Sequence, residues 1–236
     1  YYNGVASLVA NSGVIRNSGI EMTAGLKNQI GKFDWSIDAN IAFNSGKVIS
    51  EGSSQILYGT GVYGMNDWLI FDEGEAIGAI YGFEINGMVT TAGADIATLD
   101  GEVAKAGTIS YKDQNEDGLI NENDLVVNQS PAPNWILGFT GNSSYKNIDL
   151  SFTFRAMLGN YIYNNVSSNN GTFQSFEGIR PSNIHTSALI TKFTSRQLMS
   201  DYYLEDGSFL RLDNISLGYN FNKLKWAKIR AYVSGQ

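Results

Sequence analysis

Apolar and polar residues alternate one by one over unusually long stretches of this sequence. The clearest stretch is 147–158, NIDLSFTFRAML, in which one parity is apolar throughout. Successive side chains of a β-strand point to opposite faces, so this pattern predicts a strand with one apolar and one polar face. An ordinary strand averages about 5–6 residues, whereas about 9–11 residues cross a bilayer at a tilt. The length of the stretch therefore favours a membrane-crossing strand.

The same period of two recurs along the chain. It is found in residues 20–27, 33–43 and 135–145, and again near the end of the sequence in 215–221 and 229–233. In 33–43, FDWSIDANIAF, every odd-numbered position is apolar and the even-numbered positions include Asp34 and Asp38. We therefore predict an all-β chain whose strands share this two-faced character, with neighbours in the sequence pairing antiparallel.

The apolar parity of these strands must be buried against something. In a soluble sandwich it would meet a second sheet, and in a transmembrane barrel it would meet lipid, with the polar parity lining a wet lumen. The charged residues on the polar parity, together with the strand lengths, favour the barrel: these are Asp34, Asp38, Asp149 and Arg155. Ile148, Leu150, Phe152 and Phe154 are then expected on the outer face.

Composition narrows the classes of partner. The chain has 236 residues, a formal net charge of −7 and only 16 Lys and Arg residues, which form no cluster, so we expect no nucleic-acid partner. Without cysteine, neither disulfides nor Cys-ligated zinc can form. The sequence begins without Met, carries no signal peptide and ends in a strand-like RAYVSGQ, which suggests a fragment.

Connections of two sizes join the predicted strands. Residues 28–32 and 221–228 are short, as the periplasmic turns of outer-membrane barrels are, whereas 44–134 and 160–208 are long and rich in Gly, Asn and Ser. Long connections in such barrels are extracellular. We therefore expect 44–134 and 160–208 to be extracellular loop regions.

The first long region contains YKDQNEDGLINENDL at 111–125, which has the spacing of a calcium-binding loop. Gly118 occupies the sixth position, where a sharp turn is needed, but strand-like rather than helical sequence flanks the loop, so it is no EF-hand sensor. The sequence predicts a structural Ca²⁺ site, with a metal-free turn held by Asx hydrogen bonds as the alternative. The candidate ligands are Asp113, Asn115, Asp117, the Leu119 carbonyl and Asp124.

Enzyme chemistry finds little support. His185 is the single histidine, and neither a second histidine nor a nucleophile elbow accompanies it, so a loop position is the favoured interpretation. Paired acids occur in EGEA and LEDG, but acids are too common in this chain to indicate a glycosidase. We expect no catalytic residues and no cofactor besides Ca²⁺.

Several stretches, in order, resemble the C-terminal barrel portion of SusC/RagA-type TonB-dependent outer-membrane transporters of Bacteroidetes. The loop GTISYKDQNEDGLINENDL has Thr108 where the family's pattern has Asp, and EGEAIGAIYGFEINGM has Phe83 where Tyr is usual. The resemblance spans nearly the whole chain. The stretches that carry it are 11–22, 33–48, 73–88, 107–125, 131–164 and 203–221.

The resemblance implies that residues 1–236 form the last part of a barrel of about 22 strands closed around a plug. The plug and the TonB box belong to the family's N-terminal part, which this sequence lacks. The family imports nutrients across the Gram-negative outer membrane with energy from TonB. It takes up glycan or peptide fragments captured by a SusD-like surface lipoprotein. These properties are expectations for the present chain.

A second class of protein stays open from the residues alone. A secreted soluble β-rich module, stabilised by calcium and serving carbohydrate binding or adhesion, would show the same alternation. The two classes differ in what covers the apolar parity of 33–43 and 148–158. A soluble module would shelter those side chains under a second sheet.

Overall fold

A computed structural model describes residues 13–50, 57–58, 68–99, 101–173, 184–193, 197–221 and 227–236. The chain divides into two compact units. We call the first the sheet unit, which comprises Asn17–Ser45, Ala132–Asn160 and Asp206–Gln236. We call the second the loop unit, which comprises Tyr1–Arg16, Gly46–Pro131 and Tyr161–Glu205.

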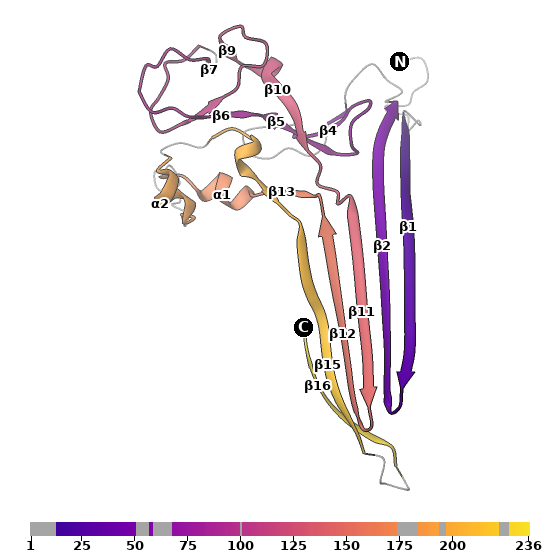
Figure 1. The fold of residues 1–236 in the computed structure, drawn as a ribbon. Coiled ribbons are helices and arrows are strands. Elements are labelled where there is room, and N and C mark those ends of the chain that lie inside the picture. Colours follow the sequence, from indigo (N-terminus) through magenta and orange to yellow (C-terminus); the bar gives the residue numbers. More distant parts are fainter. Residues whose placement is uncertain are drawn as a thin grey trace, which may run out of the picture. The chain divides into compact units, whose positions relative to one another are not determined.

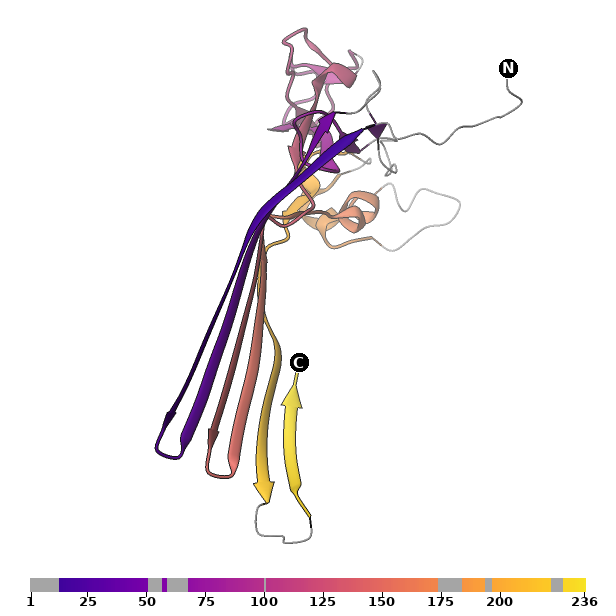
Figure 2. The same cartoon turned by 90° about the vertical axis from the view of Figure 1, so that its right-hand side faces the viewer.

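The sheet unit is built on six long strands that follow one another in chain order (Figures 1 and 2). The pairings of β11 with β2, of β12 with β11 and β15, and of β15 with β16 are antiparallel. Within the described residues β1 and β16 are the two edges of the sheet, which is therefore not closed. The strands are β1 (Val14–Ile30), β2 (Phe33–Ser50), β11 (Trp135–Tyr145), β12 (Ile148–Leu158), β15 (Phe209–Phe221) and β16 (Ile229–Gly235).

The register of these strands aligns their apolar parities into one face. Phe139 on β11 lies opposite both Ala39 on β2 and Phe154 on β12, and Leu150 on β12 lies opposite Leu217 on β15. Because side chains alternate across a strand, the opposite face carries Asp, Asn, Ser, Thr and Arg in the same registered rows. The predicted two-faced sheet with antiparallel neighbours in sequence order is confirmed.

Close approach of a side chain explains a glycine on the apolar face. A Cβ atom on Gly141 would overlap with Cζ of Phe152, so the ring of Phe152 covers this position of the neighbouring strand. Phe152 also packs near Phe139 and Phe154, with ring centroids 6.0 and 5.9 Å away. An aromatic ring over a cross-strand glycine is a recognised way to fix strand register.

A β-bulge interrupts β15. Thr153 of β12 pairs with Asn214, but Phe154 pairs with Leu212, so Asp213 is an extra residue in β15. A bulge of this kind leaves one residue unpaired and redirects its side chain.

The loop unit contains the short elements. Its sheets have the orders β10–β5–β4–β3, β13–β14, β6–β8 and β7–β9. The strands are β3 (Leu57–Tyr58), β4 (Leu69–Phe71), β5 (Ala79–Phe83), β6 (Ile85–Met88), β7 (Thr98–Leu99), β8 (Ile109–Tyr111), β9 (Leu119–Ile120), β10 (Leu125–Gln129), β13 (Tyr161–Tyr163) and β14 (Leu204–Asp206). The helices are α1 (Asn165–Asn170), α2 (Ser187–Thr191) and the 3₁₀ turns η1 (Glu122–Asp124) and η3 (Asp201–Tyr203).

A hydrophobic core holds the loop unit together. Its centre consists of Phe83, Ile109, Tyr111, Ile120 and Phe193, each at most 6% exposed. Two hydrogen bonds join β8 to residues 197–198 beside this core. Gln197 Oε1 accepts one from the Ile109 amide at 2.9 Å, and the Tyr111 hydroxyl accepts the other from the Leu198 amide at 2.8 Å. The regions 44–134 and 160–208 are therefore folded where the structure describes them.

Three strands are longer than the sequence expectation. β2 continues to Ser50 rather than ending near residue 43, β1 spans Val14–Ile30 rather than 20–27, and β15 begins at Phe209 rather than near residue 215. Beyond residue 43 of β2, the amides of Asn44 and Val48 still donate to backbone carbonyls, those of Asn134 and Glu75. No helix among the described residues is long and apolar enough to cross a membrane.

Candidate functional site

The predicted calcium-type loop forms a tight turn whose side-chain oxygens accept backbone N–H groups. Asp113 Oδ2 accepts from the Gly118 amide at 2.7 Å, and Asn115 Oδ1 accepts from the Asp117 amide at 3.1 Å. Asp117 Oδ1 in turn accepts from the Leu119 amide at 2.8 Å. Gly118 has φ of 84°, the left-handed conformation that favours glycine at the sixth position of such loops.

Asp124, the last candidate ligand, closes the loop from inside the unit. Its side chain is fully buried, and its two oxygens accept from the amides of Gln114 and Asn121, each at 2.8 Å. The bond to Asn121 is half of a capping box on η1. Buried carboxylates are stable when hydrogen bonds satisfy them, so Asp124 fastens both halves of the loop.

The residue between these ligands anchors the loop in the core. Ile120, at the eighth position, is 1% exposed and belongs to the central cluster of the loop unit. Strand β9 pairs in parallel with β7, with Leu119 opposite Thr98. The loop is therefore held by backbone pairing, by a buried apolar side chain and by Asp124.

The donor set of the loop suits a hard cation. Carboxylate, amide and carbonyl oxygens are the ligands that Ca²⁺ prefers, and each carboxylate oxygen that accepts one N–H keeps a further lone pair. Within the described parts of the chain, no three or more His, Cys, Asp or Glu side chains are gathered as a metal site. The Asx-type bonds correspond to the metal-free alternative, and Ca²⁺ binding stays a prediction.

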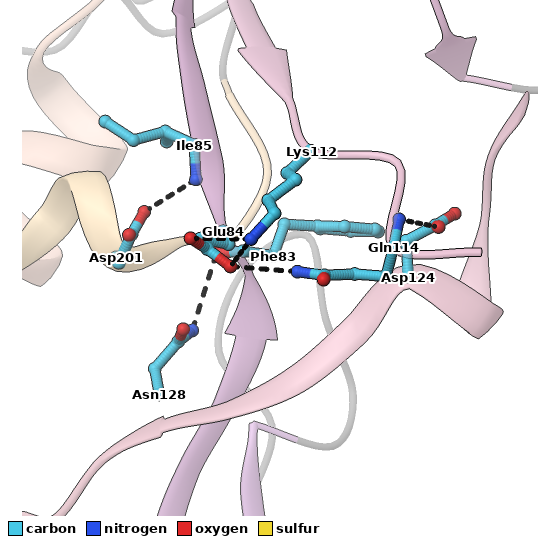
Figure 3. Close-up of polar contacts among 8 residues, drawn as sticks. All are labelled: Phe83, Glu84, Ile85, Lys112, Gln114, Asp124, Asn128 and Asp201. Carbon is cyan, nitrogen blue, oxygen red and sulfur yellow. Dashed lines mark hydrogen bonds and ion pairs between the residues drawn. The ribbon is translucent and has the colours of Figure 1, made fainter. Parts of the chain in front are cut away.

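Glu84 links the loop to the rest of its unit (Figure 3). It lies between β5 and β6, and its carboxylate accepts from Gln114 Nε2 at 2.9 Å and from Lys112 Nζ at 3.0 Å. On the other side of the same strand junction, the Ile85 amide donates to Asp201 Oδ1 at 2.9 Å. One junction thus contacts the 113–124 loop, Lys112 directly after β8, and η3 through polar bonds.

The electrostatics of this junction act on its two carboxyl groups in opposite directions. The hydrogen bond from Gln114, and after it that from Lys112, lower the pKa of Glu84 below its ordinary value. Burial raises the pKa of Asp201, while the Ile85 amide bond opposes that shift. Glu84 is therefore held as the charged partner of Lys112.

The polar face of the sheet unit carries a second set of charged contacts. Asp149 accepts from Arg230 Nε at 3.1 Å and from Asn220 Nδ2 at 2.8 Å. Arg155 Nε lies 3.2 Å from Asp213 Oδ2, and Arg211 donates to the other oxygen of Asp213. Of these residues, the sequence pattern predicts only Asp149 and Arg155 on the polar face.

Sequence reasoning missed Glu84 and Asp201 as structural partners. The signal for Glu84 was an isolated acid in an otherwise apolar and Gly-rich segment, IYGFEINGM. His185 lies just before α2, as expected of a loop residue, and its Nδ1 is 2.9 Å from the Ser187 hydroxyl. Acids of EGEA and LEDG gather in no metal-type cluster within the described residues.

One cavity of about 150 Å³ lies in the loop unit, lined by residues that include Ile96, Val103, Ile109 and Gln197. Pockets for drug-sized ligands measure about 300–1,000 Å³. The cavity is therefore too small to enclose an oligosaccharide or peptide.

The chain matches no family model. It is 30% identical over its whole length to TonB-dependent receptor P3 of Formosa agariphila and 28% identical over 93% of its length to TonB-dependent receptor SusC of Bacteroides thetaiotaomicron. The RagAB peptide transporter structure covers 94% of the chain with a TM-score of 0.68 and 18% identity. The chain belongs to the SusC/RagA-type TonB-dependent receptors.

This SusC/RagA-type chain spans about a quarter of the length of the relatives it matches: 25% of receptor P3, 22% of SusC and 25% of the RagAB chain. The RagAB peptide importer in its open-open state gives the same fold at a TM-score of 0.65. The two-faced sheet is thus the receptor barrel fold, of which the described residues form an open part.

Proposed function

We propose that this SusC/RagA-type chain forms part of the wall and the outer loops of a TonB-dependent importer in a Gram-negative outer membrane. The sheet unit would separate lipid on its apolar face from a wet lumen on its polar face. The loop unit would stand on the extracellular side. The chain would supply no catalysis, and the cargo would be glycan or peptide fragments.

The observation that carries this proposal is the exposure of the apolar face. Large apolar side chains on this face stay open to the surroundings, including Leu26 at 65%, Leu217 at 54% and Val233 at 77%. Exposed apolar area of this extent marks contact with a membrane or a partner. Lipid is the partner that requires the alternating pattern over every strand.

A soluble calcium-stabilised module has less support. Such a module would cover the apolar parity of β2 and β12 with a second sheet. Ile148 is 49% exposed and Phe33 39% exposed, and among the described residues the sheet unit consists of one sheet. The membrane function is therefore preferred.

The test uses the full-length protein. Deleting its gene should abolish growth on one or more members of a panel of glycans and peptides, and a copy with a disabled TonB box should fail to restore that growth. The protein should also stay in the membrane fraction after carbonate extraction. Recovery in the soluble fraction, or unchanged growth on every nutrient of the panel, would contradict the proposal.

We also propose that a SusD-like surface lipoprotein docks on the loop unit. Helices α1 and α2 contact each other through Ser167 and Ser187, whose hydroxyls lie 3.0 Å apart, and both expose apolar side chains. Val166 is 57% exposed and Ile190 83% exposed. A photo-crosslinker at position 190 should capture the lipoprotein in intact cells, whereas one at exposed Glu102 should capture less.

For the 113–124 loop we propose a structural Ca²⁺ ion bound by Asp113, Asn115, Asp117, the Leu119 carbonyl and Asp124. Hard oxygen donors and the absence of sulfur or imidazole in the loop support Ca²⁺ over Zn²⁺. Calorimetric titration of the intact transporter should lose one Ca²⁺ site when Asp113→Ala is combined with Asp117→Ala. Identical Ca²⁺ titrations of the wild type and the double variant would refute the proposed Ca²⁺ site.

The sidedness of this loop is tested separately. A single cysteine at position 121 should react with an impermeant thiol reagent applied to intact cells. The short turn at 28–32 would then lie on the periplasmic side. The second short turn, 221–228, includes residues 222–226, which lie outside the described residues. Labelling only after the outer membrane is opened would reverse the topology.

A further inference from the structure

Two arginines face each other on the polar side of the sheet unit. Arg155 on β12 is the direct cross-strand partner of Arg211 on β15. Like charges placed directly opposite on one face destabilise a sheet. A pair of this kind therefore requires a counter-charge, and the bulge in β15 supplies one.

The counter-charge is Asp213, the extra residue of the bulge. Its Oδ1 accepts from Arg211 Nε and, at 3.4 Å, from Arg155 Nη2. Arg155 Nε is 3.2 Å from Asp213 Oδ2, within ion-pair distance, but it is buried and makes no hydrogen bond. One carboxylate thus serves two guanidinium groups, and the cluster keeps a net charge of about +1.

A guanidinium group has five N–H donors. The bonds to Asp213 use only a small part of the donors of Arg155 and Arg211. The side chain of Arg211 is 60% exposed, and its guanidinium carbon lies 5.9 Å from the ring centroid of Phe209. The ring and Asp213 hold this guanidinium in place while other donors stay open to the polar side.

The other arginine on this face shows what a satisfied pair looks like. Arg230 contacts both oxygens of Asp149 through Nε, at 3.1 and 3.2 Å, and through Nη2. That pair matches one cation with one anion. The Arg155–Arg211–Asp213 cluster differs because it holds one cation too many and an Nε–H without an acceptor.

We propose that Arg155 and Arg211 form a carboxylate-binding site on the lumen wall, which Asp213 keeps preorganised. Guanidinium groups bind carboxylates through paired N–H donors, so the site suits an acidic cargo. This inference rests on the proposed transport function and narrows its substrate class to molecules that carry carboxyl groups. The carboxyl group can belong to an acidic oligosaccharide or to an acidic peptide.

The test is calorimetric titration of the full-length transporter in detergent at low salt. One pair of probes is hexagalacturonate and its fully methyl-esterified form, and the other is a Glu-containing hexapeptide and its Gln counterpart. Within each pair only the carboxylate differs. The pair whose acidic member binds more tightly identifies the source of the carboxyl group.

Three variants separate a binding role from a structural role. Arg211→Gln should weaken binding of the acidic probe about tenfold, because a charge-assisted pair is lost. Asp213→Asn should weaken it as well, because the carboxylate that orients both guanidinium groups is lost and the two arginines then repel each other. Arg230→Gln, which changes an arginine already matched to Asp149, should leave it unchanged. A merely structural cluster would instead lower the melting temperature in Arg211→Gln and Asp213→Asn and leave the affinity for the acidic probe unchanged.

Equal binding of acidic and neutral probes by the wild-type protein, or binding of neither acidic probe, would overturn the site. So would unchanged affinity for the acidic probe in Arg211→Gln. These results are distinct from a failure of the transport function. If deletion of the gene abolishes growth while Arg211→Gln grows like wild type on acidic nutrients, the transport function is supported and the carboxylate-binding site is refuted.

Discussion

The two units of this chain place their apolar side chains in opposite ways. Among the described residues, the buried apolar side chains belong to the loop unit, with Ala156 of β12 as the one exception. The sheet unit instead leaves large side chains open, among them Leu210 at 72% and Ile20 at 65%. The loop unit is folded around itself, as a water-soluble domain is. The sheet unit is suited to a surrounding that is itself apolar.

The surrounding medium determines whether an apolar side chain is buried or exposed. In water, burying apolar area drives folding. In lipid that driving force is missing between segments, and backbone hydrogen bonds must be satisfied within the sheet. Substitutions should therefore act by cavity formation in one unit and by polarity in the other.

The largest effect is expected from Phe193→Ala in the core of the loop unit. Phe193 is 1% exposed, and truncating a buried Phe costs about 3–5 kcal/mol. Exchange of the Ile109 and Tyr111 amides in the full-length protein should become correspondingly faster. Ile190→Ala, at an 83% exposed position nearby in sequence, is the matched control and should change stability by about 0.5 kcal/mol or less. Equal effects of the two variants would refute the assignment of this core.

The second effect concerns the apolar face of the sheet unit. Phe152 lies near the middle of β12, and Arg at the bilayer midplane costs about 2–4 kcal/mol on the outer face of a barrel. Phe152→Arg should lower the free energy of unfolding of the full-length protein from phospholipid vesicles, measured by guanidinium titration. Thr153→Arg, on the opposite face, should cost much less. The reverse order would mean that the apolar face points into the barrel.

Much of the sheet could be predicted because its information is local. Each strand shows its two faces within about ten residues, and short turns join neighbours. Even the bulge has a signal, because the apolar parity moves from Leu210 and Leu212 to Ile215 and Leu217, with Asp213 and Asn214 between them. The bulge itself is not among the predictions from the sequence.

The loop unit could be predicted far less, because its contacts join distant segments. The amide of Ile109 binds Gln197, 88 residues away, and the amide of Ile85 binds Asp201, 116 residues away. No short sequence pattern predicts hydrogen bonds between residues so far apart in the chain. Motif spacing did predict the tight turn at Gly118, but not that Asp124 would be buried beneath it as an anchor.

The third prediction tests that anchor. Asp124→Ala removes the acceptor of the Gln114 and Asn121 amides, and a partly buried donor without a partner costs about 1–3 kcal/mol. Both amides should exchange faster, and the 113–124 loop should become more sensitive to protease in calcium-free buffer. Glu122→Ala, two residues away in the same 3₁₀ turn but exposed, serves as the control. Unchanged exchange of both amides would show that the loop is held without Asp124.

The smallest effect should come from Glu84→Gln, at the junction that joins the loop to β5 and β6. The folded state lowers the pKa of Glu84, through the hydrogen bond from Gln114 and then that from Lys112, below its ordinary value of 4.5. For an acid whose pKa falls on folding, the added stability is present above the unfolded pKa and disappears as the pH drops through the folded one.

The carboxylate of Glu84 is partly exposed, so its contribution should stay within the range of about 0.2–1 kcal/mol measured for surface pairs. At neutral pH, wild type should therefore protect the Gln114 amide slightly better than Glu84→Gln does. That difference should shrink as the pH falls below 4.5, and comparing both proteins at each pH cancels the intrinsic exchange rate. Glu102→Gln breaks an exposed ion pair with Lys105 and should leave this amide unchanged. A difference that persists at the lowest pH would mean that Glu84 acts by packing rather than by charge, and that the loop unit keeps its shape through its core alone.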